Sequence, residues 1–132
     1  MERKIVKGIV ALLLVSTLLI GNACAEMIMP CADEVFSSAA AYLYSNKYLK
    51  ISCVTDDPHN IRITNCWYEI KLNGDWEYGG GITVSPSSVS NGMILGAQVN
   101  CSSYFSTGTY RVGFTVDADG HSISRYSNER TY

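Results

Sequence analysis

The sequence predicts an all-β protein, a single antiparallel β-sandwich of two sheets with seven or eight strands. The clearest evidence lies in residues 108–126, where apolar side chains alternate with polar or small ones at the two-residue period of a half-buried strand. Asp119-Gly120 provides a tight hairpin turn, because glycine tolerates positive φ, and residues 121–126 return as the partner strand. Many short strands without a convincing helix are typical of two-sheet antiparallel folds.

The other expected strands are apolar or alternating runs bounded by turn-forming residues. In chain order they cover residues 34–45, 48–55, 61–72, 75–78, 82–84 and 93–103. The alanines of the first run would also suit a helix, but its Ser, Tyr and Val content favours a strand. By composition, residues 56–60 predict a loop and residues 85–92 a crossing or edge segment.

Four local signals refine this pattern. The alternation slips near Asn65-Cys66, which predicts a β-bulge, and Asn73-Gly74 is the strongest short hairpin signal in the chain. Three consecutive glycines at residues 79–81 are expected to break or bend the return strand. Tyr110, which follows Gly108-Thr109, resembles the tyrosine corner of immunoglobulin-like folds, and Trp67 lies on the strand where such domains often bury a tryptophan.

The first 25 residues have the three parts of a secretory signal peptide: a basic start, an apolar run over residues 9–20, and the small-residue site Ala23-Cys24-Ala25. We therefore expect a signal helix over residues 1–25, cleavage after Ala25, and a β-sandwich domain over residues 26–132. Two alternatives are an uncleaved anchor helix and a lipoprotein anchored through Cys24, although Gly21 stands where a lipobox prefers leucine.

Removal of this segment, which contains three basic residues and one acidic residue, would change the formal net charge from −2 to −4. No basic stripe remains in the expected mature chain. A nucleic acid or an anionic membrane surface is therefore not an expected partner.

The expected mature chain contains four cysteines, Cys31, Cys53, Cys66 and Cys101. An even number in a small exported domain predicts two disulfides, although spacing alone leaves all three pairings open. Neighbouring strands in sandwich folds favour Cys53 with Cys101, which would leave Cys31 for Cys66. Unpaired buried thiols are the alternative.

Catalytic and metal-binding patterns are sparse, so we expect neither an enzyme nor a cofactor. The two histidines, His59 and His121, fall in a loop and beside a turn, and the chain contains no Gly-x-Ser-x-Gly or Cys-x-x-Cys motif. Asp117 and Asp119 resemble the start of a calcium loop, but the later ligands of that pattern are missing. A hairpin turn with solvated acids is the simpler interpretation.

Aromatic residues are numerous for the length of the chain. Exposed Tyr and Trp can stack on sugar rings or anchor a protein partner, whereas the ordinary alternative is packing within and between strands. Trp76 and Tyr78, beside the glycines at 79–81, are the first candidates for a binding patch.

The chain carries motifs in four segments: Met29–Ala39, Ile63–Trp67, Asn73–Trp76 and Gly108–His121. Together these motifs resemble a family of small exported proteins of Gram-positive anaerobes, a domain of unknown function. The resemblance implies a compartment and a fold, and it implies no activity, cofactor or catalytic residue.

The favoured function is a secreted, non-enzymatic interaction module with a protein or glycan partner. One alternative is a structural or envelope-associated protein without a small ligand, and another is a small toxin-like secreted effector. The oligomeric state does not follow from the sequence.

Overall fold

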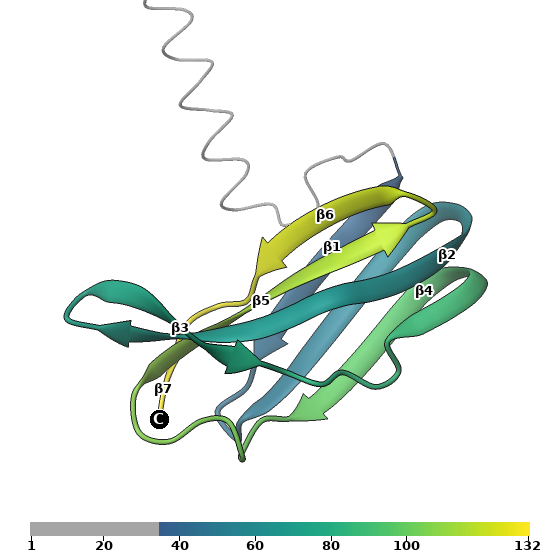
Figure 1. The fold of residues 1–132 in the computed structure, drawn as a ribbon. Helices are drawn as coiled ribbons and strands as arrows, with labels where there is room; N and C mark the ends of the chain where they lie inside the picture. Colours follow the sequence, from purple (N-terminus) through teal and green to yellow (C-terminus); the bar gives the residue numbers. More distant parts are fainter. Residues whose placement is uncertain (1–34) are drawn as a thin grey trace, which may run out of the picture.

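The computed structural model describes residues 35–132, which form an all-β antiparallel architecture (Figure 1). The expectation for the fold class is confirmed at this level. The strands are β1 (Phe36–Leu43), β2 (Tyr48–Leu72), β3 (Asp75–Gly81), β4 (Ser88–Asn100), β5 (Thr109–Ala118), β6 (His121–Tyr126) and β7 (Arg130–Thr131). No helix within residues 35–132 could span a membrane. The expected signal peptide, Cys24 and Cys31 lie outside the described residues.

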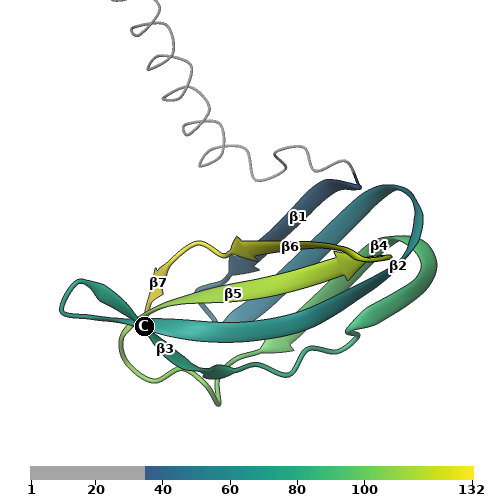
Figure 2. The ribbon, with the colours of Figure 1, turned by 45° about the horizontal axis from the view of Figure 1, so that its top comes forward.

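The long strand β2 organises the fold. Its first part pairs with β1 on one side and β4 on the other, as Ala39 with Cys53 and Cys53 with Leu95. Its second part pairs with β5 and β3, as Glu69 with Arg111 and with Tyr78. The sheet therefore curls over into two layers that share β2 (Figures 1 and 2). The described strands hydrogen-bond into one sheet, and not into the two separate sheets that the sequence predicts.

The bend in β2 falls where the sequence predicted a loop. Residues 56–60 instead continue the strand, so this prediction is wrong. The pairing with β4 shifts register between Val54 and His59 and again between His59 and Ile61, and Pro58 lies inside this irregular region. A proline can occupy a strand where the ladder is interrupted, because its missing N–H is then not required. The polar composition therefore marks a bend and not a chain break.

The predicted bulge and both predicted hairpin turns are confirmed. Pairing with β5 shifts between Ile63 and Asn65. Asn73 and Gly74 have φ angles of 53° and 87°, and Asp119 and Gly120 have φ angles of 47° and 95°, the left-handed conformations of tight hairpins. The hairpin of β2 and β3 projects from the body of the fold (Figures 1 and 2).

The chain after β3 differs from expectation, because residues 82–84 are not a strand. The N–H of Ile82 still donates to the carbonyl of Cys66 at 2.8 Å, but the chain then leaves β2 until Ser87 accepts from the N–H of Ile63 at 2.8 Å. Strand β4 begins at Ser88, five residues before the expected start at Met93.

The hydrophobic core lies between the two layers. The predicted inward face of β5 is confirmed, since Tyr110, Val112, Phe114 and Val116 are all buried. The opposing layer contributes buried side chains from β1, β2 and β4, namely Ala39, Ala41, Leu43, Leu49, Ile51, Cys53, Leu95 and Ala97. Burial of apolar area on both inner faces drives the curling of the sheet.

The Tyr110 side chain makes the contact that the tyrosine-corner analogy predicts. Its hydroxyl oxygen accepts a hydrogen bond from the backbone N–H of Ser106 at 3.2 Å and lies 3.1 Å from the Ser106 hydroxyl. The ring of Tyr110 stacks on Phe105 with centroids 4.6 Å apart. The loop before β5 is thereby fastened to the core.

Cys53, Cys66 and Cys101 are buried free thiols, which differs from the expected disulfides. The favoured pairing of Cys53 with Cys101 is wrong, because the register places Cys53 opposite Leu95. Cys101 lies six residues further along that chain, about 20 Å away at the usual rise per residue. A disulfide requires Cα atoms within about 7 Å.

Candidate functional site

One outer surface of the curled sheet gathers aromatic and charged side chains from four strands. Residues directly opposite each other in neighbouring strands point to the same side of a sheet. Glu69 of β2 faces Tyr78 of β3 and Arg111 of β5, Lys71 faces Trp76, and Gly113 lies between Trp67 and Tyr126. We call this surface the aromatic face, defined by Trp67, Glu69, Trp76, Tyr78, Arg111 and Tyr126.

Arg111 occupies the centre of the aromatic face. Its guanidinium carbon lies 4.4 Å from the centroid of the Trp76 ring and 4.0 Å from that of the Tyr126 ring. Its Nη2 donates to Glu69 Oε1 at 2.9 Å. Its Nε is buried and has no hydrogen-bond partner among residues 35–132. The two aromatic π-faces and the carboxylate together compensate the charge of the partly buried cation.

The Glu69 carboxylate holds three side chains of the face together. Its Oε1 accepts from Arg111 and its Oε2 accepts from the indole N–H of Trp67 at 3.1 Å. Partial burial raises the pKa of Glu69, but hydrogen bonds from Arg111, Trp67 and Tyr126 lower it by more, so the net shift is downward. Burial and the same carboxylate raise the pKa of Tyr126. Glu69 is therefore ionised, and it positions Arg111 and Trp67.

The Trp67 ring lies directly on the backbone of β5. A Cβ atom at Gly113 would overlap the indole ring, so only glycine permits this approach. The indole also meets the Tyr126 ring edge-on, with centroids 5.9 Å apart and planes at 84°. Trp67 is half-buried on the outer surface, although the immunoglobulin analogy would place it in the core.

The structure brings the two candidate binding residues, Trp76 and Tyr78, to this same face. Trp76 is half-buried because it covers Arg111, and the ammonium of Lys71 lies 5.5 Å from its ring centroid. Tyr78 is 70% exposed and is the most exposed of the large hydrophobic side chains in the described chain. Tyr126 is 42% exposed. Trp76 is thus held rigidly, while Tyr78 and Tyr126 present open ring surface to solvent.

A row of hydroxyl groups continues the aromatic face along β5 and β6. The hydroxyls of Thr115 and Ser124 are 2.8 Å apart, and the Ser122 hydroxyl donates to Asp117 Oδ1 at 2.9 Å. These side chains follow Arg111 and Tyr126 on the same side of the two strands. Polar donors and acceptors therefore adjoin the exposed rings.

The two candidate calcium ligands are engaged in the β5–β6 turn. Asp117 Oδ2 accepts from the N–H of Gly120 at 3.2 Å. Asp119 Oδ2 accepts from the N–H of Asn60 at 3.2 Å and lies 2.9 Å from His59 Nδ1. Hydrogen bonds from His59 and Asn60 lower the pKa of Asp119. Within residues 35–132 no group of three or more His, Cys, Asp or Glu side chains could hold a metal ion.

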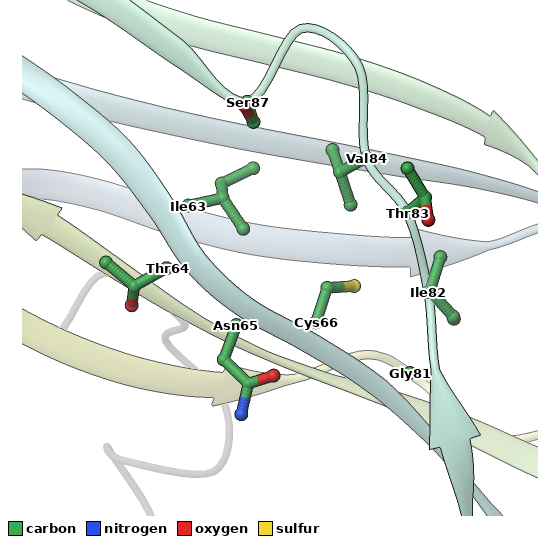
Figure 3. A pocket seen from close by; sticks show the side chains of 9 residues that line it. All are labelled: Ile63, Thr64, Asn65, Cys66, Gly81, Ile82, Thr83, Val84 and Ser87. Carbon is green, nitrogen blue, oxygen red and sulfur yellow. The ribbon is translucent and has the colours of Figure 1, made fainter.

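A groove of about 400 Å³ opens where β2 loses its partner between the end of β3 and the start of β4 (Figure 3). Figure 3 shows Ile63, Cys66, Ile82 and Val84 around it, while Thr64 and Asn65 point away from the opposite wall. None of its lining residues is charged. Its polar lining groups are hydroxyls, the Asn65 amide and the Cys66 thiol.

Sequence reasoning selected Trp76 and Tyr78 but missed the four other members of the aromatic face. The sequence did contain a signal for the outer face of β2, because Trp67, Glu69 and Lys71 alternate with inward-facing residues on this strand. The contact of Arg111 with Trp76 could not be predicted from the sequence, since it joins β3 to the β5–β6 hairpin, which lies further along the chain. A scan against protein-family models and a search of curated proteins found no match to this chain.

Proposed function

We propose that this chain is an exported, non-enzymatic binding module whose aromatic face takes a glycan. The observation that carries the proposal is the combination of open Tyr78 and Tyr126 rings with a rigid support of Trp76, Arg111 and Glu69. Sugar rings have apolar C–H faces that pack on aromatic rings, and hydroxyl groups that require hydrogen-bond partners. The aromatic face and its adjoining hydroxyl row supply both kinds of contact.

The rigidity of the support favours binding. Ordering flexible side chains on association costs about 0.5–1.5 kcal/mol for each side chain. Trp76 and Tyr126 are already fixed on either side of Arg111, and Trp67 is fixed by Glu69 and Gly113. A ligand would therefore lose little affinity to ordering these rings.

The charged side chains of the aromatic face favour an uncharged ligand. Arg111 and Glu69 neutralise each other in a direct ion pair, and Lys71 lies 3.9 Å from Glu129. No unbalanced cluster of one sign remains to select a strongly charged ligand. An uncharged polysaccharide fits this surface better than an acidic one.

The tertiary arrangement supports an immunoglobulin-like two-layer domain as the carrier of this face. Two antiparallel layers enclose one core, and Tyr110 makes the tyrosine-corner contact with Ser106. Domains of this architecture carry many unrelated functions, so the proposal depends on the aromatic face and not on the fold.

The test is retention of the purified chain on a panel of insoluble polysaccharides, peptidoglycan sacculi and whole cells. We expect retention on at least one neutral polysaccharide and about a tenfold loss of affinity in Tyr78→Ala, since an exposed aromatic anchor contributes more than about 1 kcal/mol. Tyr42→Ala is the matched control, because Tyr42 is 47% exposed on β1 in the other layer.

No retention on any polysaccharide would overturn the glycan proposal. Equal losses in Tyr78→Ala and Tyr42→Ala would show that binding does not use the aromatic face. Retention on cells alone, lost after protease treatment of those cells, would identify a protein partner.

A further inference from the structure

Three buried thiols in the described chain take no part in the aromatic face. Cys53, Cys66 and Cys101 are 0%, 5% and 0% exposed and belong to one core cluster. The pairing of Cys53 with Cys101 is excluded by distance, because the two lie about 20 Å apart along the β2–β4 ladder. Cys53 and Cys66 lie on opposite sides of the bend in β2. The contacts around Cys66 and Cys101 favour these two as the pair.

Contacts made by the residues just after Cys66 and Cys101 bring their chain segments together. Two residues after Cys66, the Tyr68 ring meets the ring of Phe105 at 5.6 Å and that of Tyr104 at 5.9 Å. The N–H groups of Tyr104 and Phe105 both donate to the carbonyl of Cys101, at 3.0 and 3.1 Å. The segment that starts at Cys101 is thus folded back onto the segment that starts at Cys66.

The residues after β3 add a second link between the same two segments. The N–H of Ile82 donates to the Cys66 carbonyl at 2.8 Å, and the N–H of Thr83 donates to the Tyr104 hydroxyl at 3.3 Å. The Cys66 side chain borders the groove of Figure 3, beside Ile82. A small thiol reagent therefore has a path toward this sulfur from solvent.

Electrostatics agree with this proximity. Burial raises the pKa of the Cys66 thiol to about 12, and the neighbouring Cys101 contributes to the increase. Burial also raises the pKa of Cys101 to about 11. Because the thiolate is the reactive form, these sulfurs react slowly once the core has closed. Oxidation is expected during folding, before burial is complete.

We propose that Cys66 and Cys101 form a disulfide between β2 and the end of β4 when the chain folds under oxidising conditions. A disulfide oxidant such as oxidised glutathione accepts the two electrons. One thiolate attacks the oxidant, the second thiolate displaces the mixed disulfide, and two glutathione thiols leave with the two protons. The covalent link would close a loop that contains all of β3 and β4.

The test is to refold the full chain in a buffer of oxidised and reduced glutathione, block the remaining thiols and map the tryptic peptides without reduction. Cleavage at Lys50, Arg62, Lys71 and Arg111 separates the three thiols into peptides 51–62, 63–71 and 72–111. We expect peptide 63–71 to be joined to peptide 72–111. The melting temperature should fall by roughly 10 °C or more on reduction.

Cys66→Ser should abolish this linked peptide and the effect of reduction on melting, whereas Cys53→Ala should leave both unchanged. Full labelling of Cys66 and Cys101 after oxidative refolding would overturn the proposal. A link from either residue to Cys31 or Cys53 would overturn it as well. The mapping uses the unmodified sequence, so the result does not depend on whether a variant folds.

Discussion

The contact between Trp67 and Gly113 offers the sharpest test of how the aromatic face is built. The change is Gly113→Ala, which adds one methyl group where the backbone of β5 meets the indole ring. The added carbon would overlap ring atoms of Trp67, and Gly113 is buried with strands on both sides. The ring must therefore move off the strand.

Three losses set the size of the expected decrease in the free energy of unfolding. Forcing an extra carbon into a packed site costs about 1–3 kcal/mol. Displacing the indole also removes its hydrogen bond to ionised Glu69, about 1.5 kcal/mol, and its edge contact with Tyr126, about 0.5–1.5 kcal/mol. Because these terms overlap and alanine restricts the unfolded chain, we expect a net loss of about 2–4 kcal/mol in the free energy of unfolding.

The measurement is urea unfolding followed by circular dichroism and tryptophan fluorescence. For a slope of about 1–3 kcal/mol per M, the midpoint should fall by roughly 1–2 M. Native tryptophan emission should also change, since the ring leaves its site on the strand. Gly96→Ala is the control, because Gly96 lies in β4 and a Cβ there meets nothing within 4 Å. The control should stay within about 0.5 kcal/mol of the unchanged protein. A Gly113→Ala midpoint equal to that of the control would refute this account of the face.

Further expectations concern the tyrosine corner and the two carboxylates with lowered pKa. Tyr110→Phe should cost about 1 kcal/mol in urea unfolding, because the N–H of Ser106 loses its acceptor. The lowered pKa of Glu69 contributes stability that is present above its ordinary value of 4.5 and is lost as the pH falls through its folded value. In Glu69→Gln, the melting temperature should fall less steeply from pH 6 to pH 2 than in the unchanged protein. An equal fall in both proteins would contradict this contribution of Glu69. His59→Ala should move the NMR-titrated pKa of Asp119 upward toward its ordinary value, whereas no movement would show that the contact at 2.9 Å does not form in solution.

Local interactions explain which features were predictable from the sequence. The turns at Asn73-Gly74 and Asp119-Gly120 depend on residues that tolerate positive φ, and this tolerance is a property of the residues themselves. The inward face of β5 follows from a two-residue alternation that is written directly in the chain. The bulge near Asn65 follows from the slip in that alternation.

Features that depend on long-range pairing were decided only by the tertiary structure. The polar run at residues 56–60 could not reveal that β2 bends through it and takes part in both layers, because the bend depends on partners in β4 and β5. The separation of Cys53 from Cys101 depends on strand register, which a count of cysteines does not contain.

The aromatic face shows most clearly which features the sequence determined and which features the tertiary structure decided. The sequence by itself determined that this is an all-β antiparallel chain and that Trp76 and Tyr78 follow the Asn73-Gly74 turn. Tertiary pairing decided that Trp76 covers Arg111, which lies 35 residues further along the chain. Backbone conformation is set largely by each residue and its neighbours, whereas a surface shared by four strands is set by their register, which is fixed only when the core closes.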